Sequence, residues 1–202
     1  MCDVLSEPNL RMAYPRSRDS IRRDTYLLRA KLGLSGTPYF PVLHFIEHVL
    51  PQVDPTFIFE VAEEDSLSMI QAEYIPQSNT IRVKQSVYNA AADGYWWARS
   101  TMAHELGHYY YHDEKSVRYA KLDLGQRIPP DFDPERQANV FAAELLAPIN
   151  LINGMSKEQI GKEFGVSYAV ARRQLYALEK VRSRQSRKKQ QKKKAARQKS
   201  DR

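Results

Sequence analysis

The sequence contains a single cysteine, Cys2, so no disulfide bond can form within the chain. This excludes the disulfide-rich secreted scaffolds and favours a reducing compartment. No apolar run approaches the ~20 residues that a membrane-spanning helix needs. Residues 1–23 are polar and charged and lack the apolar core segment of a signal peptide. We therefore expect a cytoplasmic protein without a membrane segment.

The net charge of +7 is concentrated at one end of the chain. Residues 181–202 contain eleven Lys or Arg and one Asp, a net charge of +10, which leaves −3 for residues 1–180. Because this segment has few apolar residues and many like charges, we expect a disordered basic tail. It either solubilises the protein or makes weak contacts with polyanions. The rest of the chain is long enough for one compact domain with a proper core.

The most informative motif is His-Glu-Leu-Gly-His at residues 104–108. Residues four apart share one face of a helix, so His104 and His108 can reach a single metal ion. Glu105 projects into the same pocket, placed to take a proton from a water molecule there. Gly107 leaves room for another backbone or a substrate over the site. The competing interpretation is a surface helix that carries two histidines by chance.

A catalytic zinc site needs a third protein ligand and an open fourth position. The strongest candidate lies in a helix predicted to begin after Asp133, which can cap it, and to end near Pro148. Glu135 and Asn139 are one turn apart there, so Glu135 can ligate while Asn139 holds the outer nitrogen of a histidine ligand. Glu144, nine residues further along, is the competing carboxylate. From these residues alone, Glu135 is the favoured third ligand, and Glu144 remains an alternative.

Two blocks of sequence resemble a known family, the ImmA/IrrE metallopeptidases, whose zinc site is of the thermolysin-like (gluzincin) type. The first block is RSTMAHELGH at residues 99–108, and the second is ERQANVFAAELLAP at residues 135–148. The second is the more specific, because it follows the first at the family's spacing. Softer similarity extends from Pro41 to about Lys180.

The resemblance implies an α+β fold, a zincin-like domain with a small mixed or antiparallel sheet and active-site helices. It also implies zinc as the metal, with Glu105 as the general base and with three ligands, His104, His108 and Glu135. The residue that stabilises the transition state matches no motif. A hydroxyl of the Tyr109-Tyr110-Tyr111 run is a candidate, but three tyrosines in a row offer no means of choosing.

Two other histidine patterns are interpreted as structural. His44 to His48 reads H-x-x-E-H, an inverted zinc motif. Its flanks are apolar, Pro51 is expected to end the helix, and no carboxylate-bearing helix follows at a matching interval. His112 lies one turn beyond His108 on the same face and is interpreted as a helix-end residue, with contact to the substrate as the alternative.

Four regions are expected: a disordered lead (1–19), the zincin-like metallopeptidase domain (20–150), a helix-turn-helix-like helical unit (151–180) and the disordered basic tail (181–202). Within the peptidase domain, local patterns predict the following elements: a helix from Ile21 to Leu32 capped by Ser20, strands at Phe57–Val61, Leu67–Ile75 and Thr80–Val87, and a metal helix from Tyr95 to Tyr111. In zinc peptidases of this type an edge strand holds the substrate backbone, and we expect one of these strands to do so.

The helical unit after Pro148 has clear boundary signals. Ser156 is expected to cap its first helix, Gly165 to break it, and Ser167 to cap the second. Such a unit either serves only as packing or contacts DNA phosphates, in which case Arg172 and Arg173 are the candidate contacts.

Three functions remain in competition. The first is a zinc endopeptidase, and the resemblance suggests that its substrate is a DNA-binding repressor, because many proteins of this family are encoded beside a helix-turn-helix repressor and antagonise it, in mobile elements or stress responses. The second is a binding protein that retains the zinc fold and neutralises a repressor or a toxin without cutting it. The third is a DNA-binding regulator that uses the C-terminal unit and tail. The intact Glu105 favours the first, since a pure binder needs no general base.

Overall fold

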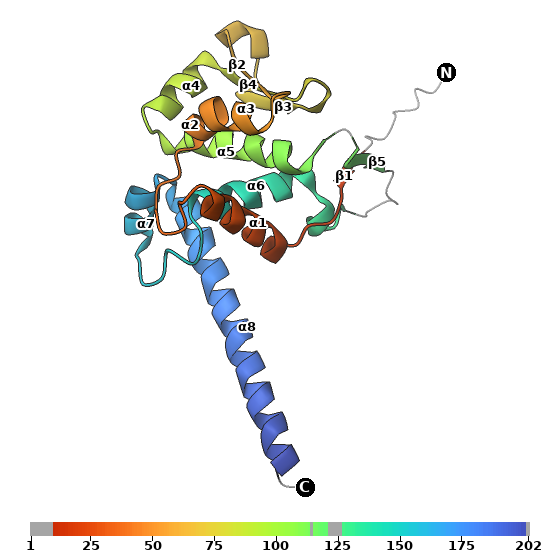
Figure 1. The fold of residues 1–202 in the computed structure, drawn as a ribbon, viewed down its shortest axis with the longest axis vertical. Helices are drawn as coiled ribbons and strands as arrows, with labels where there is room; N and C mark the ends of the chain where they lie inside the picture. Colours follow the sequence, from red (N-terminus) through yellow and green to blue (C-terminus); the bar gives the residue numbers. More distant parts are fainter. Residues whose placement is uncertain (1–9, 114, 121–126, 201–202) are drawn as a thin grey trace, which may run out of the picture.

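The computed structural model describes residues 10–113, 115–120 and 127–200. A mixed α+β body carries a small sheet at one end, and a long C-terminal helix projects from the other (Figure 1). The two helices that matter most are α5 (Trp96–Tyr111) and α6 (Pro134–Leu146), which pack against each other across the middle of the body. None of the described helices combines the length and apolar composition that a bilayer crossing requires.

Helices α5 and α6 share the centre of the hydrophobic core. Met102 and Leu106 of α5 and Phe141 and Leu145 of α6 are fully buried. Their spacing of four residues places each pair on one face of its helix. Asp133 caps α6 as predicted, since its side chain accepts from the backbone N–H of Glu135 at 3.0 Å.

The three-stranded sheet is mixed, in the order β2-β4-β3. Strand β2 (Ile58–Ala62) runs parallel to β4 (Thr80–Lys84), and β3 (Ala72–Ile75) pairs with β4 in the antiparallel sense. The turn between β3 and β4 ends at Asn79 in the left-handed conformation (φ 50°), which asparagine tolerates. Strand β3 therefore lies at an edge of the sheet.

Two of the predicted strands are too long. The predicted strand Leu67–Ile75 is reduced to β3, because a 3-10 turn occupies Glu64–Leu67 and the chain turns again at Ser68, which has φ 48°. The prediction Thr80–Val87 stops at Lys84, where helix α4 (Gln85–Ala92) begins. Val87, Ala90 and Ala91 of this helix have helical spacing and are buried, so packing against the core stabilises a helix that the sequence analysis missed.

The segment from Val42 to Val53 is helical throughout, so the prediction that Pro51 ends the helix is wrong. It consists of α2 (Val42–His44), a π-helical turn (Phe45–Val49) and α3 (Leu50–Val53). The N–H of Leu50 reaches back to the carbonyl of Phe45, which leaves Pro51 in the first turn of α3. A missing N–H costs no hydrogen bond at that position.

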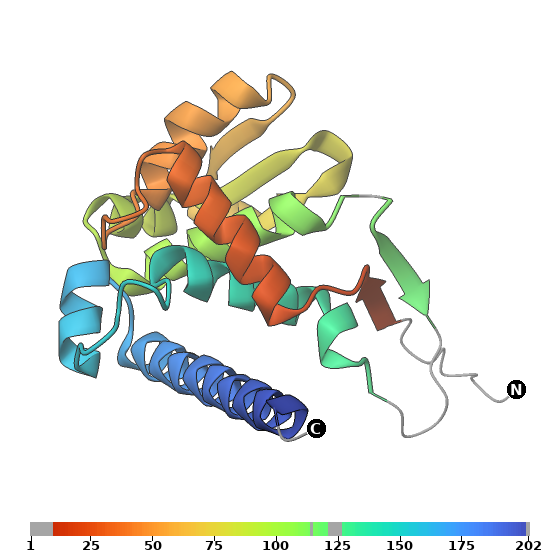
Figure 2. The ribbon, with the colours of Figure 1, turned by 60° about the horizontal axis from the view of Figure 1, so that its bottom comes forward.

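The prediction of an unstructured lead at residues 1–19 is wrong from Leu10 onward, and residues 1–9 lie outside the described part. Strand β1 (Leu10–Ala13) pairs antiparallel with β5 (Val117–Ala120) at the side of the body (Figure 2). Helix α1 (Arg18–Lys31) begins three residues before the predicted start, because Ser17 rather than Ser20 provides the cap. The pairing of β1 with β5 joins residues that are far apart in the chain, so no local sequence pattern predicts it.

The C-terminal region begins with two helices at the predicted boundaries. Helix α7 (Lys157–Phe164) starts with a capping box at Ser156 and ends at Gly165, which has φ 62°. Helix α8 then runs from Tyr168 to Ser200. The predicted disordered tail is therefore wrong for residues 181–200: Lys, Arg, Gln and Ala are good helix formers, and they extend a helix already nucleated by packing. Residues 201 and 202 lie outside the described part.

Candidate metal centre

Three side chains from α5 and α6 converge on one point. The Nε2 atoms of His104 and His108 are 3.0 Å apart. The carboxylate of Glu135 lies beside both, with Oε2 at 3.2 Å from His104 Nε2 and Oε1 at 3.4 Å from His108 Nε2. Among the described residues, these three alone form a group of at least three side chains whose potential ligand atoms all lie within 4.8 Å of one another.

The donor set fits a catalytic metal centre. Two imidazole nitrogens and one carboxylate oxygen form a three-ligand set that zinc accepts, with a fourth position for water or substrate. The side chains of His104 and His108 are only 21% and 16% exposed, whereas that of Glu135 is 67% exposed. The site is thus open to solvent on the α6 side. The side chains of His104 and His108 beside it hold the pKa of Glu135 well below its usual range, so the carboxylate is available as an anion.

Glu105 is buried immediately beside this group, with 7% of its surface exposed. Burial raises its pKa, and the charges of His104 and His108 partly offset that effect. Its carboxylate also accepts a hydrogen bond from the backbone N–H of Tyr74, in strand β3. A buried carboxylate with a raised pKa is better matched to taking and giving a proton near neutral pH than an exposed one.

Asn139 lies one turn after Glu135, as predicted from the spacing. Its amide nitrogen donates to the backbone carbonyl of Glu135 at 2.8 Å. Burial lowers the pKa of His104, but its hydrogen bond to Glu135, nearby carboxylate charges and a hydrogen bond to Asn139 outweigh this and raise the pKa overall. The structure therefore places Asn139 beside His104, a candidate metal ligand. The role of Asn139 at a bound metal stays a prediction.

A cavity of about 590 Å³ opens over the metal group. Its lining includes His108 and Glu135 of the metal group, and also residues 73–77, which comprise the end of strand β3 and the following turn. Arg11 and Val117, from the β1–β5 pair, line the cavity as well. The edge strand β3 thus faces the candidate metal centre across a cleft.

His112 is the C-cap of α5, in agreement with its interpretation as a helix-end residue, but its side chain also makes buried contacts. It is only 3% exposed, and its Nδ1 lies 2.8 Å from Nδ1 of His108. Its Nε2 lies 3.0 Å from Oε1 of Gln137, a fully buried residue of α6. Burial lowers the pKa of His112 to about 4. The i+4 spacing from His108 was the available signal, but the partner from α6 could not be read from it.

The hydroxyl groups of two tyrosines in the triple run are directed to carboxylates. Tyr109 donates to Asp54 at 2.8 Å, and Tyr111 donates to Asp24 at 3.0 Å. Asp54 also accepts from the amide of Asn79 at 2.9 Å, at the end of the β3–β4 turn. This contact ties the wall of the cleft to helix α5, so Tyr109 acts as a support for the site.

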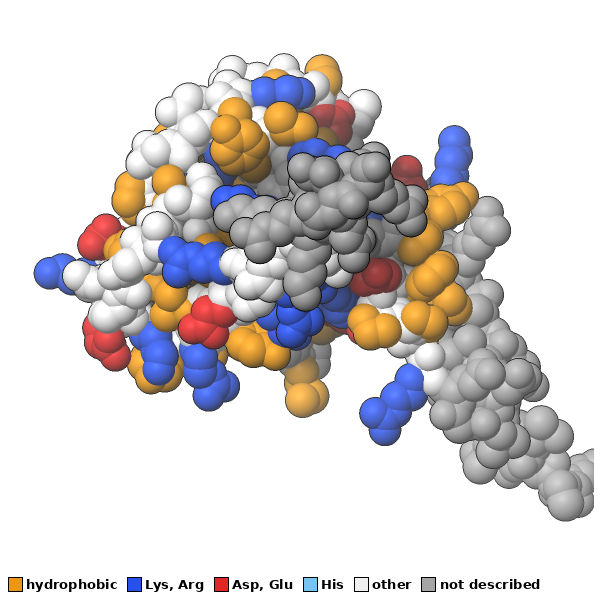
Figure 3. Space-filling model, turned by 90° about the horizontal axis from the view of Figure 1, so that it is seen from below, with side chains coloured by type: hydrophobic (Ala, Val, Ile, Leu, Met, Phe, Trp, Pro, Cys, Tyr) orange, Lys and Arg blue, Asp and Glu red, His pale blue; other side chains and the backbone are white. Residues whose placement is uncertain are grey.

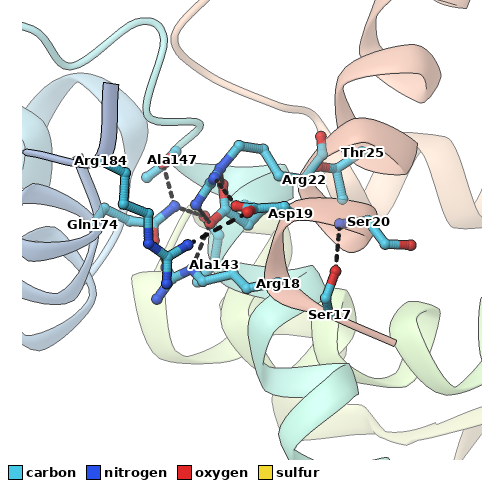
Figure 4. A network of polar contacts seen from close by, with 11 residues as sticks. Ser17, Arg18, Asp19, Ser20, Arg22, Thr25, Ala143, Ala147, Gln174 and Arg184 are labelled. Atoms are coloured by element: carbon cyan, nitrogen blue, oxygen red, sulfur yellow. Dashed lines mark hydrogen bonds and ion pairs between the residues drawn. The ribbon is translucent and has the colours of Figure 1, made fainter. Parts of the chain in front are cut away.

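Glu144, the competing carboxylate, lies in a different place. It is fully buried and bonded to two arginines of α1, with Arg18 Nε at 2.7 Å and Arg22 Nη2 at 3.0 Å from its Oε1. Gln174 of α8 accepts from Arg18 and donates to the carbonyl of Ala147 at 2.7 Å, so the network joins α1, α6 and α8 (Figure 4). Glu144 holds helices together and takes no part in the metal group.

The inverted motif also lacks a metal group. The rings of His44 and His48 are tilted by 59° to each other with their centroids 5.0 Å apart, and the carboxylate of Glu47 accepts from the hydroxyl of Tyr88 at 3.0 Å. The side chain of His48 is 56% exposed. The structural interpretation of these two histidines agrees with this arrangement.

In a comparison with known protein families, residues 98–176 match the IrrE N-terminal-like domain, which is a peptidase family. The matched segment contains most of α5, all of α6 and α7, and the start of α8. No curated protein matches the chain. The match of this segment supports the assignment to the ImmA/IrrE metallopeptidase family that the two sequence blocks suggest.

Proposed function

We propose that the protein is a zinc-dependent endopeptidase that acts on a regulatory protein. The observation that supports this best is the convergence of His104, His108 and Glu135 within 4.8 Å, with Glu105 buried beside them. A binding protein requires neither an open metal position nor a buried carboxylate next to it. Both features are those of a hydrolytic centre.

In this proposal His104, His108 and Glu135 hold the metal. Zinc, when bound, supplies a Lewis acid that polarises the scissile carbonyl and lowers the pKa of water. Glu105 accepts a proton from the attacking water and passes it to the amine that leaves. Its burial next to the cleft raises its pKa toward the range in which one carboxyl group can perform both transfers.

We further propose that the substrate binds as an extended strand along β3. This strand has β4 as a neighbour on one side, and its other side lies against the cavity that contains His108 and Glu135. Pairing with an edge strand recognises the peptide backbone and leaves specificity to the side chains. Such binding requires a flexible or unfolded segment of the partner. For the partner we propose a DNA-binding repressor with a helix-turn-helix, as the family resemblance suggests.

The substitution Glu105→Gln tests the proposal. The amide nearly matches the carboxylate in shape but accepts no proton, so we expect normal zinc content and folding with at least a hundred-fold loss of proteolysis. Glu63→Gln is the matched control, because Glu63 is exposed and lies outside the cleft. The substrate to test is a small helix-turn-helix protein, sought among the open reading frames that flank the gene for this chain.

The same variant separates cleavage from binding. For a reporter gene under the control of that repressor, the wild type and Glu63→Gln should relieve the repression, whereas Glu105→Gln should not. If Glu105→Gln relieves repression as well as the wild type, the protein acts by binding a repressor or toxin, and the endopeptidase proposal fails.

A further inference from the structure

We propose that Gln137 and His112 form a positioning chain that sets the tautomer of His108, so that its Nε2 lone pair faces the metal. This inference rests on the proposed metal centre, since it concerns one of its ligands. Neither residue is itself a ligand in the metal group. Their effect would reach it through the hydrogen bond between the rings of His112 and His108.

The chain starts from an amide whose orientation is fixed. Gln137 is fully buried, and its Nε2 lies 2.8 Å from the carbonyl oxygen of Tyr14 and 2.7 Å from that of Asp131. Carbonyl oxygens only accept hydrogen bonds, so the NH₂ group must face them. The other atom of the amide, Oε1, is then the one that faces His112, and it can only accept.

This acceptor determines the tautomer of His112. Its Nε2 is 3.0 Å from Oε1 of Gln137 and must carry the proton of that hydrogen bond. A neutral imidazole carries one N–H, so Nδ1 of His112 keeps its lone pair. The ring is only 3% exposed.

The tautomer of His108 follows from the same logic. Its Nδ1 lies 2.8 Å from the lone pair on Nδ1 of His112, so it must donate. Nε2 of His108 is therefore left unprotonated, and this is the atom that lies 3.4 Å from Glu135 and 3.0 Å from Nε2 of His104. A histidine ligand needs that arrangement, because metal binding uses a deprotonated nitrogen while the other ring nitrogen donates.

The chain is anchored outside the active-site helices. Tyr14 lies between β1 and α1, and Asp131 lies in the 3-10 turn (Pro130–Phe132) before α6. These two segments are also joined to each other, since the N–H of Arg16 donates to the carbonyl of Asp131 at 2.8 Å. The orientation of His108 is thus set by backbone groups that the N-terminal segment helps to place.

Two substitutions of His112 separate positioning from packing. His112→Phe keeps a ring of similar size but removes both nitrogens. His112→Asn supplies an acceptor oxygen near the position of Nδ1. Both leave Oε1 of Gln137 without its partner, so the difference between them isolates the acceptor for His108. His48→Phe, at an exposed histidine of the inverted motif, controls for the loss of one histidine.

The first measurement is zinc affinity, by competition with a chromogenic chelator, with folding checked by circular dichroism. Loss of the partner of a histidine ligand costs about 10- to 100-fold in metal affinity. We expect a loss in this range for His112→Phe, recovery of most of the affinity in His112→Asn, and no change in His48→Phe. Equal affinity in folded His112→Phe and wild type would overturn the inference. So would an equal loss in the Phe and Asn variants.

The second measurement needs neither a variant nor the metal. A long-range ¹H–¹⁵N correlation spectrum of the metal-free wild type reports which nitrogen of each histidine carries the proton. We expect protonation at Nδ1 for His108 and at Nε2 for His112. The reverse assignment for His108 would refute the chain even if both His112 variants failed to fold.

Failure of this inference can be told from failure of the metal centre. If His104→Ala retains full zinc affinity, the assignment of the metal centre is wrong, and so is the proposed function that depends on it. If His104→Ala abolishes binding while His112→Phe has no effect, the metal centre stands and only the positioning chain is wrong.

Discussion

Gly107 of α5 lies directly against Ala138 of α6. A Cβ atom added to Gly107 would be 2.9 Å from Cα and 3.2 Å from the carbonyl oxygen of Ala138. The two helix backbones can approach this closely only because one of them lacks a side chain at the crossing. Ala138 is three residues beyond Glu135, so the same crossing brings the third candidate ligand to the histidines of α5.

Gly107→Ala should therefore destabilise the protein and weaken zinc binding. Alanine is favoured over glycine in a helix by about 1 kcal/mol, but overpacking costs about 1–3 kcal/mol, and here the obstructing atoms are backbone. We expect a net loss in the free energy of urea unfolding and a lower zinc affinity, since α6 must move away. Gly36→Ala is the control, because no atom lies within 4 Å of its added Cβ. Equal stability and affinity in both variants would contradict the prediction.

The ligand assignment predicts one zinc ion per chain. His104→Ala and Glu135→Ala should each lose most of the metal, since two remaining ligands do not make a stable site. Elemental analysis of protein purified without added metal measures this. His48→Ala should retain the wild-type content, because His48 lies in the inverted motif outside the metal group. Full occupancy in either ligand variant would show that the assignment is wrong.

Glu144→Ala should destabilise the fold without removing a metal ligand. It would leave Arg18 and Arg22 facing a buried space without their carboxylate, and breaking a buried pair costs about 3–5 kcal/mol. Asp19→Ala is the matched control: Asp19 also binds Arg22, at 2.7 Å, but its side chain is 63% exposed. An exposed pair contributes about 0–1 kcal/mol. Chemical unfolding measures both variants, and zinc content should stay at one per chain in folded protein.

The metal helix and the helix of Glu135 were predictable because their signals are local. The spacing of His104 and His108, the cap at Asp133 and the one-turn step from Glu135 to Asn139 are all contained within single helices. Their meeting at one point could only be inferred from the chemistry of a metal site and from the family resemblance.

What the sequence analysis missed depends on contacts between distant elements. The pairing of β1 with β5 and the contact of Gln137 with His112 join side chains or strands from separate parts of the chain. Helix α4 was missed because it follows a strand directly and has no side-chain cap at Lys84. Burial of one face of this helix, which the sequence does not display by itself, stabilises it.

Asp54 should make the stability of the fold depend on acid pH. Hydrogen bonds from Thr56, Asn79 and Tyr109 lower its pKa to about 2. A carboxyl group whose pKa is lower in the folded than in the unfolded protein stabilises the fold above its unfolded value, near 4. It loses that contribution as the pH falls toward the folded value.

Asp54→Asn should thus be less stable than the wild type at pH 7, by about 1 kcal/mol or less, because solvent screens the charge of this partly exposed carboxylate. The difference should shrink as the pH falls from about 4 to about 2. Urea unfolding at several pH values measures it. Asp93→Asn, whose side chain lies at the exposed end of α4, is the control and should show little difference at any of these pH values. A constant difference for Asp54→Asn would mean that the charge of Asp54 is unimportant.

The C-terminal part of α8 should bind polyanions without contributing to the fold. Residues 185–202 contain nine Lys or Arg and one Asp, a net charge of +8, which leaves −1 for residues 1–184. The side chains from Arg182 to Gln191 are exposed, on a helix that projects from the body. On the face of the body seen in Figure 3, the Lys and Arg side chains among the described residues are interspersed with acidic and apolar ones.

Removal of residues 185–202 should leave folding and zinc content unchanged and abolish weak, non-specific DNA binding. The affinity of the full chain should fall steeply with salt, because each neutralised phosphate releases counterions. A full-length variant with Arg187, Lys188 and Lys189 changed to Gln separates charge from length, and its salt dependence should be shallower by about three contacts. Gel-shift titrations at two salt concentrations decide the matter. Binding that is sequence-selective and persists without the tail would instead point to Arg172 and Arg173, at the start of α8, as DNA contacts.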